Sequence, residues 1–160
     1  MLFQLFALFL GFAVFAVEAA FPGIVSPANG TVIAANTEFS FEYESIADYG
    51  VSSYNFTCWI FTTRPRFFDT STHFAKGYHL GRFSQPNYPA IPYTSNPPPP
   101  SFRMPDFSKL GPGWGVGSNE THATVYFAVI EEYADGEPSL GYRMAMTINE
   151  IFYTRPPATH

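Results

Sequence analysis

The stretch Ser53-Tyr-Asn-Phe-Thr-Cys-Trp-Ile-Phe-Thr-Thr63 is the densest β-forming run in the chain, because it is rich in aromatic and β-branched residues and lacks Gly and Pro. Side chains alternate along a strand, so one face carries Tyr54, Phe56, Cys58 and Ile60. The other face carries the glycosylation sequon Asn55-Phe-Thr57, and a glycan needs solvent. We therefore predict that the first face packs in a core and that Trp59 and Phe61 lie on the outer face.

Other runs have the same β character. Residues 38–44 alternate strictly, which predicts an antiparallel strand with one wet face. Its inward residues are Phe39, Phe41 and Tyr43. Residues 123–130 are apolar on both faces, as expected of a central strand. Residues 141–148 form a returning strand, one face of which is made of Met144, Met146 and Ile148.

The remaining short runs and turn residues also favour β-structure. Residues 24–25 and 31–33 form short strands on either side of a turn at residues 26–30, and residues 78–83 predict another strand. No stretch beyond residues 1–19 has the periodicity of a helix. About seven short strands predict an all-β chain, folded as a single immunoglobulin- or fibronectin III-like antiparallel β-sandwich with a long proline-rich loop.

Residues 1–19 have the features of a signal peptide. Residues 2–17 are almost unbroken apolar sequence, and Val17-Glu-Ala19 places small residues at the −3 and −1 positions of a cleavage site. The run is shorter than the roughly 20 residues that span a bilayer. We predict a secreted domain at residues 20–160, extracellular or cell-wall associated, with no membrane anchor after cleavage.

Residues 85–105 are rich in proline, which favours polyproline II and excludes helix. One interpretation is a flexible linker or a ligand for proline-binding domains. The segment is too apolar for a solvated linker, however. We therefore predict that residues 85–119, including the glycine-rich loop 111–117, are an insertion packed on the sheet, where it could cover Trp59 and Phe61.

Three sequons predict N-glycosylation at Asn29, Asn55 and Asn119. The single cysteine, Cys58, permits no internal disulfide. We interpret it as a small buried hydrophobe, the alternative being a reactive thiol or an intermolecular bridge.

Charge argues against a nucleic-acid partner. The formal net charge is −5, whereas a nucleic-acid binder carries a concentrated basic face. Residues 64–109 contain six basic and two acidic side chains, which form either a solvated surface or a contact for an anionic partner.

The sequence predicts no catalytic residue, metal site or cofactor. Asp69, His73 and His79 match no compact metal site, and the adjacent Glu131 and Glu132 point to opposite faces of a strand. The mature N-terminus, Ala20-Phe21, lacks the histidine of a copper-dependent oxygenase. The alternative is a hydrolase-like or metal-dependent extracellular enzyme whose residues meet only in three dimensions.

Aromatic residues make up 19% of the chain, and such residues dominate recognition surfaces. The candidates for binding a cell-wall polysaccharide or an extracellular protein are Trp59, Phe61, Tyr88, Tyr93 and Trp114. The alternative is that they pack in the core or between loop and sheet.

Residues 24–33, Ile-Val-Ser-Pro-Ala-Asn-Gly-Thr-Val-Ile, followed by Phe39-Ser-Phe-Glu-Tyr43, resemble the opening of the immunoglobulin-like domain in the fungal Ser/Thr-rich GPI-anchored cell-wall family and its β-1,6-glucan-assembly relatives. The whole chain looks more like a group of small secreted basidiomycete proteins of unknown function. The stretches that carry this likeness are residues 46–55, 81–89, 104–110 and 126–133. The first resemblance implies an immunoglobulin-like domain of the wall, and the second implies no activity.

Overall fold

The computed structural model describes residues 21–47, 52–66, 77–86, 93–109, 122–134 and 143–155, and these residues form an all-β structure without a helix. The signal peptide predicted at residues 1–19 lies outside the described residues. The strands are β1 (Gly23–Ser26), β2 (Thr31–Ala34), β3 (Glu38–Ser40), β4 (Glu42–Glu44), β5 (Ser52–Phe61), β6 (Gly77–Ser84), β7 (Ser101–Arg103), β8 (His122–Ala134) and β9 (Arg143–Thr154). No helix within these ranges is long and apolar enough to cross a membrane.

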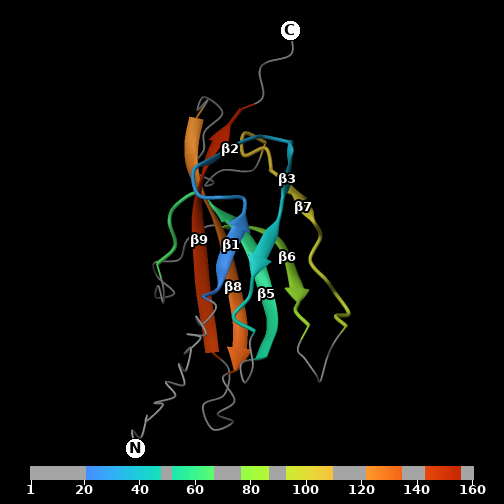
Figure 1. Ribbon diagram of the computed structural model, residues 1–160. Coiled ribbons are helices and arrows are strands. Elements are labelled where there is room, and N and C mark those ends of the chain that lie inside the picture. Colours follow the sequence, from blue (N-terminus) through green and yellow to red (C-terminus); the bar gives the residue numbers. More distant parts are fainter. Residues whose placement is uncertain are drawn as a thin grey trace, which may run out of the picture.

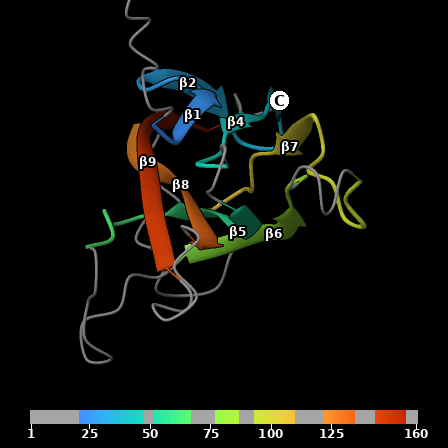
Figure 2. The ribbon, with the colours of Figure 1, turned by 60° about the horizontal axis from the view of Figure 1, so that its bottom comes forward.

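The strands form one five-stranded sheet, in the order β2-β9-β8-β5-β6, and two smaller pairs, β1-β4 and β3-β7 (Figure 1). The small pairs lie over one face of the large sheet (Figure 2). The predicted strand at residues 38–44 is split at Phe41, whose backbone N–H donates to the carbonyl of Pro100 at 2.8 Å. The first half therefore pairs with β7 and the second half with β1.

The pairing of β2 differs from the prediction of a wholly antiparallel structure. β2 runs parallel to β9, with Thr31 opposite Ile151 and Ala34 opposite Thr154. The turn at residues 27–30 moves the chain from the layer of β1 to the edge of the large sheet, where the N–H of Gly30 donates to the carbonyl of Glu150 at 2.7 Å. β1 and β2 thus belong to different layers.

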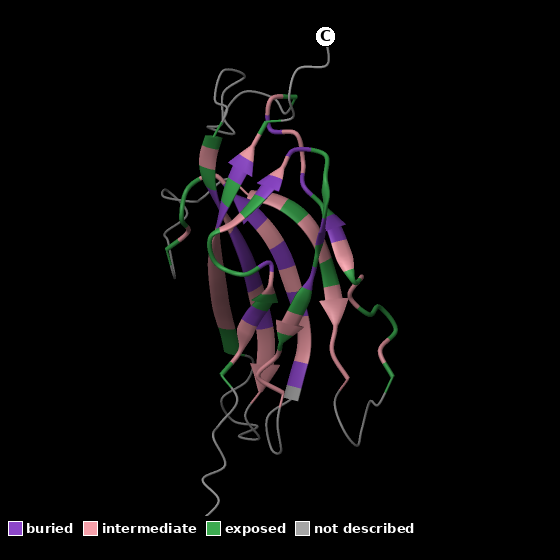
Figure 3. Cartoon of the chain, turned by 45° about the horizontal axis from the view of Figure 1, so that its top comes forward, coloured by how far each residue is buried: buried purple, intermediate pink, exposed green. Residues whose placement is uncertain are grey.

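Aromatic side chains fill the space between the layers. The ring of Phe127 on β8 lies 5.9 Å from Phe39 and 5.8 Å from Phe41, centroid to centroid. Phe41 also packs at 6.0 Å from Phe56 on β5. Buried residues recur along the strands of both layers (Figure 3). The inward orientation predicted for Phe39 and Phe41 is confirmed.

The predicted faces of β5 are confirmed for most of its length. Phe56, Cys58 and Ile60 are fully buried. Tyr54 is the exception, because the register shifts between Ser53 and Asn55, so that a β-bulge leaves one extra residue on β5. Ser53, and not Tyr54, takes the fully buried position.

The described residues of the proline-rich segment are 85–86 and 93–105, and the second range contains β7 and contributes to the core. Phe102 and Met104 are buried, as is Phe107 just beyond it. β7 pairs with β3, on the opposite side of the large sheet from Trp59 and Phe61. The described residues of this segment therefore do not cover Trp59 and Phe61.

Candidate functional site

The outer face of the five-stranded sheet is the side turned away from β3, β4 and the aromatic core. We use this name for the outward residues of β9, β8, β5 and β6, which form four cross-strand rows. The rows are Glu150–Tyr126–Phe61–Gly77, Ile148–Ala128–Trp59–His79, Met146–Ile130–Thr57–Arg82 and Met144–Glu132–Asn55–Ser84. Phe152 and Val32, paired on β9 and β2, extend the same face. No strand in the described part of the chain lies over it (Figure 2).

This face is apolar in its middle and exposes large side chains toward both ends, with Val32 and Phe152 beyond the row of Glu150 and Met144 in the row of Glu132. Val32, Met144 and Phe152 are 64%, 54% and 47% exposed. Methionine is common at binding surfaces because its flexible thioether adapts to irregular partners. Exposed apolar side chains gathered on one face mark an interaction site more often than scattered ones do.

Two ion pairs border the apolar middle. Arg64 Nη1 lies 3.2 Å from Glu150 Oε1, and Arg82 Nη2 lies 2.7 Å from Glu132 Oε2. Both pairs are exposed to solvent, so each contributes at most about 1 kcal/mol to stability. Because each pair is internally neutral, the face carries little charge in a molecule whose net charge is −5.

Trp59 and Phe61 form a packed aromatic cluster on this face. Their rings are nearly parallel, at 5.9 Å and 16°, and the Trp59 ring lies 4.6 Å from that of His79. A Cβ atom at Gly77 would overlap the Phe61 ring, so this ring lies directly on the β6 backbone. Phe61 is only 7% exposed, and little of its ring is therefore available to a ligand.

The indole N–H of Trp59 is a buried donor without a partner among the described residues. An unpaired buried donor costs about 1–3 kcal/mol. The Trp59 side chain is half-buried. As far as the structure describes the chain, this face therefore holds an unsatisfied buried donor beside its exposed apolar groups.

The structure brings together two of the five predicted binding residues. Trp59 and Phe61 are adjacent, whereas Tyr93 is 88% exposed in the proline-rich segment. Tyr88 and Trp114 lie outside the described residues. The sequence did not identify Val32 and Phe152 as surface residues, because their exposure depends on the parallel pairing of β2 with β9.

Two sequons are described. Asn29 is exposed in the turn before β2, and its Oδ1 accepts a hydrogen bond from the N–H of Glu150 at 2.8 Å. Asn55 is half-buried on the outer face, in the row of Met144 and Glu132. Asn119 lies outside the described residues. A glycan on Asn55 would stand at one end of the outer face.

Inside the core, Glu131 is a fully buried carboxylate. It accepts hydrogen bonds from the Tyr43 hydroxyl at 2.7 Å and from the N–H of Ile46 at 3.2 Å. Burial, reinforced by the bond to Glu131, raises the pKa of Tyr43 well above its ordinary range. Glu132 lies on the outer face, so the prediction that the two carboxylates point to opposite faces is confirmed.

Cys58 is a free thiol packed in the core. Burial raises the pKa of this thiol far above its ordinary value. A thiol must ionise and reach solvent to react, so Cys58 behaves as a small hydrophobe.

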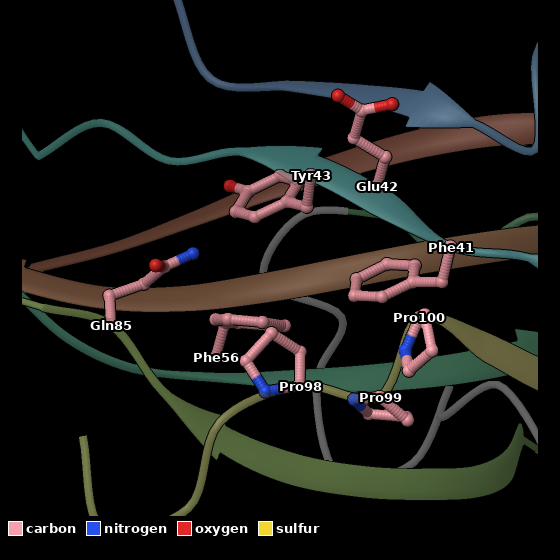
Figure 4. Close-up of a pocket in the computed structure, with 8 residues that line it drawn as sticks. All are labelled: Phe41, Glu42, Tyr43, Phe56, Gln85, Pro98, Pro99 and Pro100. Atoms are coloured by element: carbon pink, nitrogen blue, oxygen red, sulfur yellow. The ribbon is translucent and has the colours of Figure 1, made fainter. Parts of the chain in front are cut away.

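A shallow groove of about 330 Å³ opens beside Tyr43. Phe41, Tyr43 and Phe56 line it together with Pro98, Pro99 and Pro100 (Figure 4). Glu42 points away from the rings and Gln85 lies near the hydroxyl end of Tyr43 (Figure 4). Within the described ranges, no three His, Cys, Asp or Glu side chains group as metal ligands would.

The chain matches no known family model, no curated protein and no solved structure.

Proposed function

We propose that this protein is a secreted, N-glycosylated, non-enzymatic binding module whose outer face binds a protein on an extracellular surface. The observation that carries the proposal is the apolar outer face, with Val32, Met144 and Phe152 exposed. A monomeric domain rarely exposes apolar side chains together on one face without a partner.

The strand order supports an immunoglobulin-type β-sandwich for this module. In that fold, one sheet contains the strands C, F and G, and the variable type adds a further strand beside C. Here β5, β8 and β9 are adjacent in that order, and β6 adds the further strand. The opposite layer of β1, β3, β4 and β7 takes the place of strands A, B and E.

A protein partner fits the outer face better than a polysaccharide does. Sugars bind by stacking on open aromatic rings, but the Phe61 ring is almost fully covered. The exposed groups are aliphatic, thioether and phenyl side chains, which suit the apolar centre of a protein interface. Cell-wall polysaccharide is the second candidate, favoured by the exposed ring of Tyr93.

The predicted signal peptide at residues 1–19 and the three sequons support secretion. The resemblances to the fungal cell-wall family and to small secreted basidiomycete proteins support a fungal extracellular location. The alternative of an extracellular hydrolase-like or metal-dependent enzyme has one candidate group, the buried carboxylate of Glu131. Its bonds to Tyr43 and Ile46 are those of a structural carboxylate.

The test is retention of the secreted protein on intact basidiomycete hyphae, with and without protease pretreatment, beside insoluble glucan, chitin and cellulose. The face variant is Val32→Lys with Phe152→Lys, since both side chains are exposed and charge there disturbs no core. The matched control is Val25→Lys, an exposed valine on β1 in the opposite layer.

We expect hyphal retention to fall at least about tenfold in the face variant, to stay unchanged in the control, and to disappear after protease treatment. Equal retention of the face variant and the wild type would show that the outer face is not the binding surface. Retention that survives protease, occurs on a purified polysaccharide and is lost in Tyr93→Ala would establish the polysaccharide function instead.

A further inference from the structure

Among the described residues, no strand pairs with the outer edge of β9 over the first half of its length. β2 covers only Ile151–Thr154 of this strand. The backbone groups of Glu150 point to the same edge, because its carbonyl accepts from Gly30 at 2.7 Å and its N–H donates to Asn29 at 2.8 Å. Pairing with β8 continues without a bulge from Arg143 to Thr154, so the alternation is regular.

This alternation fixes which residues present free backbone groups. In an antiparallel ladder, every second residue turns its N–H and C=O to the same neighbour. On β9, the residues whose N–H and C=O groups point to the same edge as those of Glu150 are Met144, Met146 and Ile148. Among the described residues, no backbone group pairs with these three at the outer edge.

The other sheet edges are protected by the devices that natural proteins use. At the β6 edge, the Asn96 carbonyl accepts from the N–H of Ser84 at 2.9 Å, and the Asn96 side chain donates to the carbonyl of Arg82. A register shift opposite Cys58 and Trp59 also interrupts β6. β2 and β7 are only four and three residues long.

Within the part of the chain that the structure describes, the edge of β9 has none of these devices between Met144 and Ile148. The sequence Met144-Ala-Met-Thr-Ile148 contains no charge, no proline and no bulge. A long, regular and apolar edge is a template for another strand. It must therefore be covered by a strand or remain open to aggregation.

We propose that a second copy of this chain covers this edge, by antiparallel pairing of β9 with β9 of the partner. In the register centred on Met146, this residue faces its own copy and Met144 faces Ile148 of the other molecule. The free backbone groups then meet one another, and each directly opposed pair exchanges two hydrogen bonds. The same register keeps the outer faces of both molecules on one side.

The chemistry of the edge favours a second copy over an unrelated peptide. Opposed like charges destabilise strand pairs, and the paired stretch has none, in a molecule whose net charge is −5. The stripe of Met144, Met146 and Ile148 continues into the identical stripe of the partner. The two outer faces thereby become one continuous apolar surface.

The length of the paired stretch limits the strength of this dimer. The backbone groups of Glu150 are already bonded to the turn before β2, so the new ladder ends there. Interfaces of this small size are weak, and we expect dissociation constants on the order of tens of micromolar.

Cysteine cross-linking tests the register. In Met146→Cys the two thiols face each other across the symmetry axis, at a backbone distance that a disulfide can span. Met144→Cys is the control, since Met144 faces Ile148 of the partner and lies several residues from its own copy. Native Cys58 is fully buried and adds no accessible thiol.

We expect covalent dimer in most of the Met146→Cys protein after air oxidation and in little of the Met144→Cys protein. Equal cross-linking of both variants would reflect random collision and would overturn the proposal. Absence of cross-linking in both would overturn it as well.

Sedimentation equilibrium of the secreted full-length protein tests the reversible dimer. In Met146→Lys two like charges oppose each other, and we expect at least about a tenfold weaker association. Phe152→Lys is the control, because it changes the outer face where β2 already covers the edge. Wild type that stays monomeric at several hundred micromolar, or a dimer unaffected by Met146→Lys, would refute the proposal. The dimer is measured without any ligand, so its failure leaves the proposed binding function untouched.

Discussion

At the scale of single residues, Gly77 decides how the outer aromatic cluster packs. The ring of Phe61 occupies the space that a Cβ at residue 77 would need, and Trp59 Cε3 lies 3.0 Å from the same point. The burial of Phe61 therefore depends on a glycine on the neighbouring strand. Such overpacking costs about 1–3 kcal/mol.

We predict that Gly77→Ala lowers the free energy of unfolding by about 1–3 kcal/mol, measured by urea denaturation. Gly23→Ala is the matched control, because a Cβ there meets its nearest atom at 3.9 Å. A Gly77→Ala protein as stable as the Gly23→Ala protein would contradict this account of the cluster.

The buried thiol of Cys58 predicts a loss of stability at alkaline pH. Burial raises its pKa in the folded state, while the unfolded thiol ionises near its ordinary value of 9.0. The contribution is therefore fully present below pH 9 and is lost as the pH rises above it. The loss reaches about 1.4 kcal/mol one pH unit above the pKa of the unfolded thiol.

The measurement is the unfolding free energy at pH 7.5 and pH 10 for the wild type and for Cys58→Ala. We expect the wild type to lose about 1.4 kcal/mol more than the variant between these two values. The constant packing cost of the substitution cancels in this comparison. Parallel pH profiles would mean that the thiol is not shielded from solvent.

At the scale of elements, Asn96 connects the proline-rich segment to the edge of β6. Its carbonyl and its side chain bond to Ser84 and Arg82, two residues apart on the strand. Asn96→Ala removes the donor to the Arg82 carbonyl but keeps the backbone carbonyl that accepts from Ser84, so we expect the segment to be held less firmly and the Ser84 amide to exchange faster, with a loss of about 0.5–1.5 kcal/mol in local protection. Tyr93→Ala, in the same segment but exposed, should leave this amide unchanged.

Features that depend on one strand alone could be predicted from the sequence, whereas features that depend on a partner strand could not. The faces of residues 56–60 could be predicted, because alternation within one strand determines them. The burial of Ser53 in place of Tyr54 could not be predicted, because the bulge arises from the register with β8. The pairing of β2 could not be predicted from the sequence either, because its partner strand is about 120 residues further along the chain.

The candidate site was predictable to a similar degree. The common face of Met144 and Met146 follows from alternation, but which side of the sheet it takes depends on β8 and β5. Trp59 and Phe61 were placed on the correct side, whereas the burial of Phe61 depends on Gly77. Sequence periodicity gives orientation within a strand, while exposure is a property of several strands together.

At the scale of the whole molecule, Phe127 joins the two layers. Its ring contacts those of Phe39, Phe41 and Phe102, all on the opposite layer. With no internal disulfide available, such packing must hold the layers together. We predict that Phe127→Ala lowers the unfolding free energy by about 3–5 kcal/mol in calorimetry or urea denaturation.

The matched control for this prediction is Phe152→Ala, which removes an exposed phenylalanine from the outer face. It should cost less than about 1 kcal/mol. Similar costs for the two variants would show that the aromatic cluster is not the principal link between the layers.

The parallel pair of β2 and β9 also sets the order of events during synthesis. A chain made from its N-terminus presents β2 long before β9 exists, and contacts between such distant residues slow folding. Until β9 is made, the Oδ1 atom of Asn29 lacks the hydrogen bond that it accepts from the N–H of Glu150. This bond uses Oδ1, whereas a glycan attaches at Nδ2, so the folded turn, in which Asn29 is exposed, still presents the predicted sequon after β9 has paired.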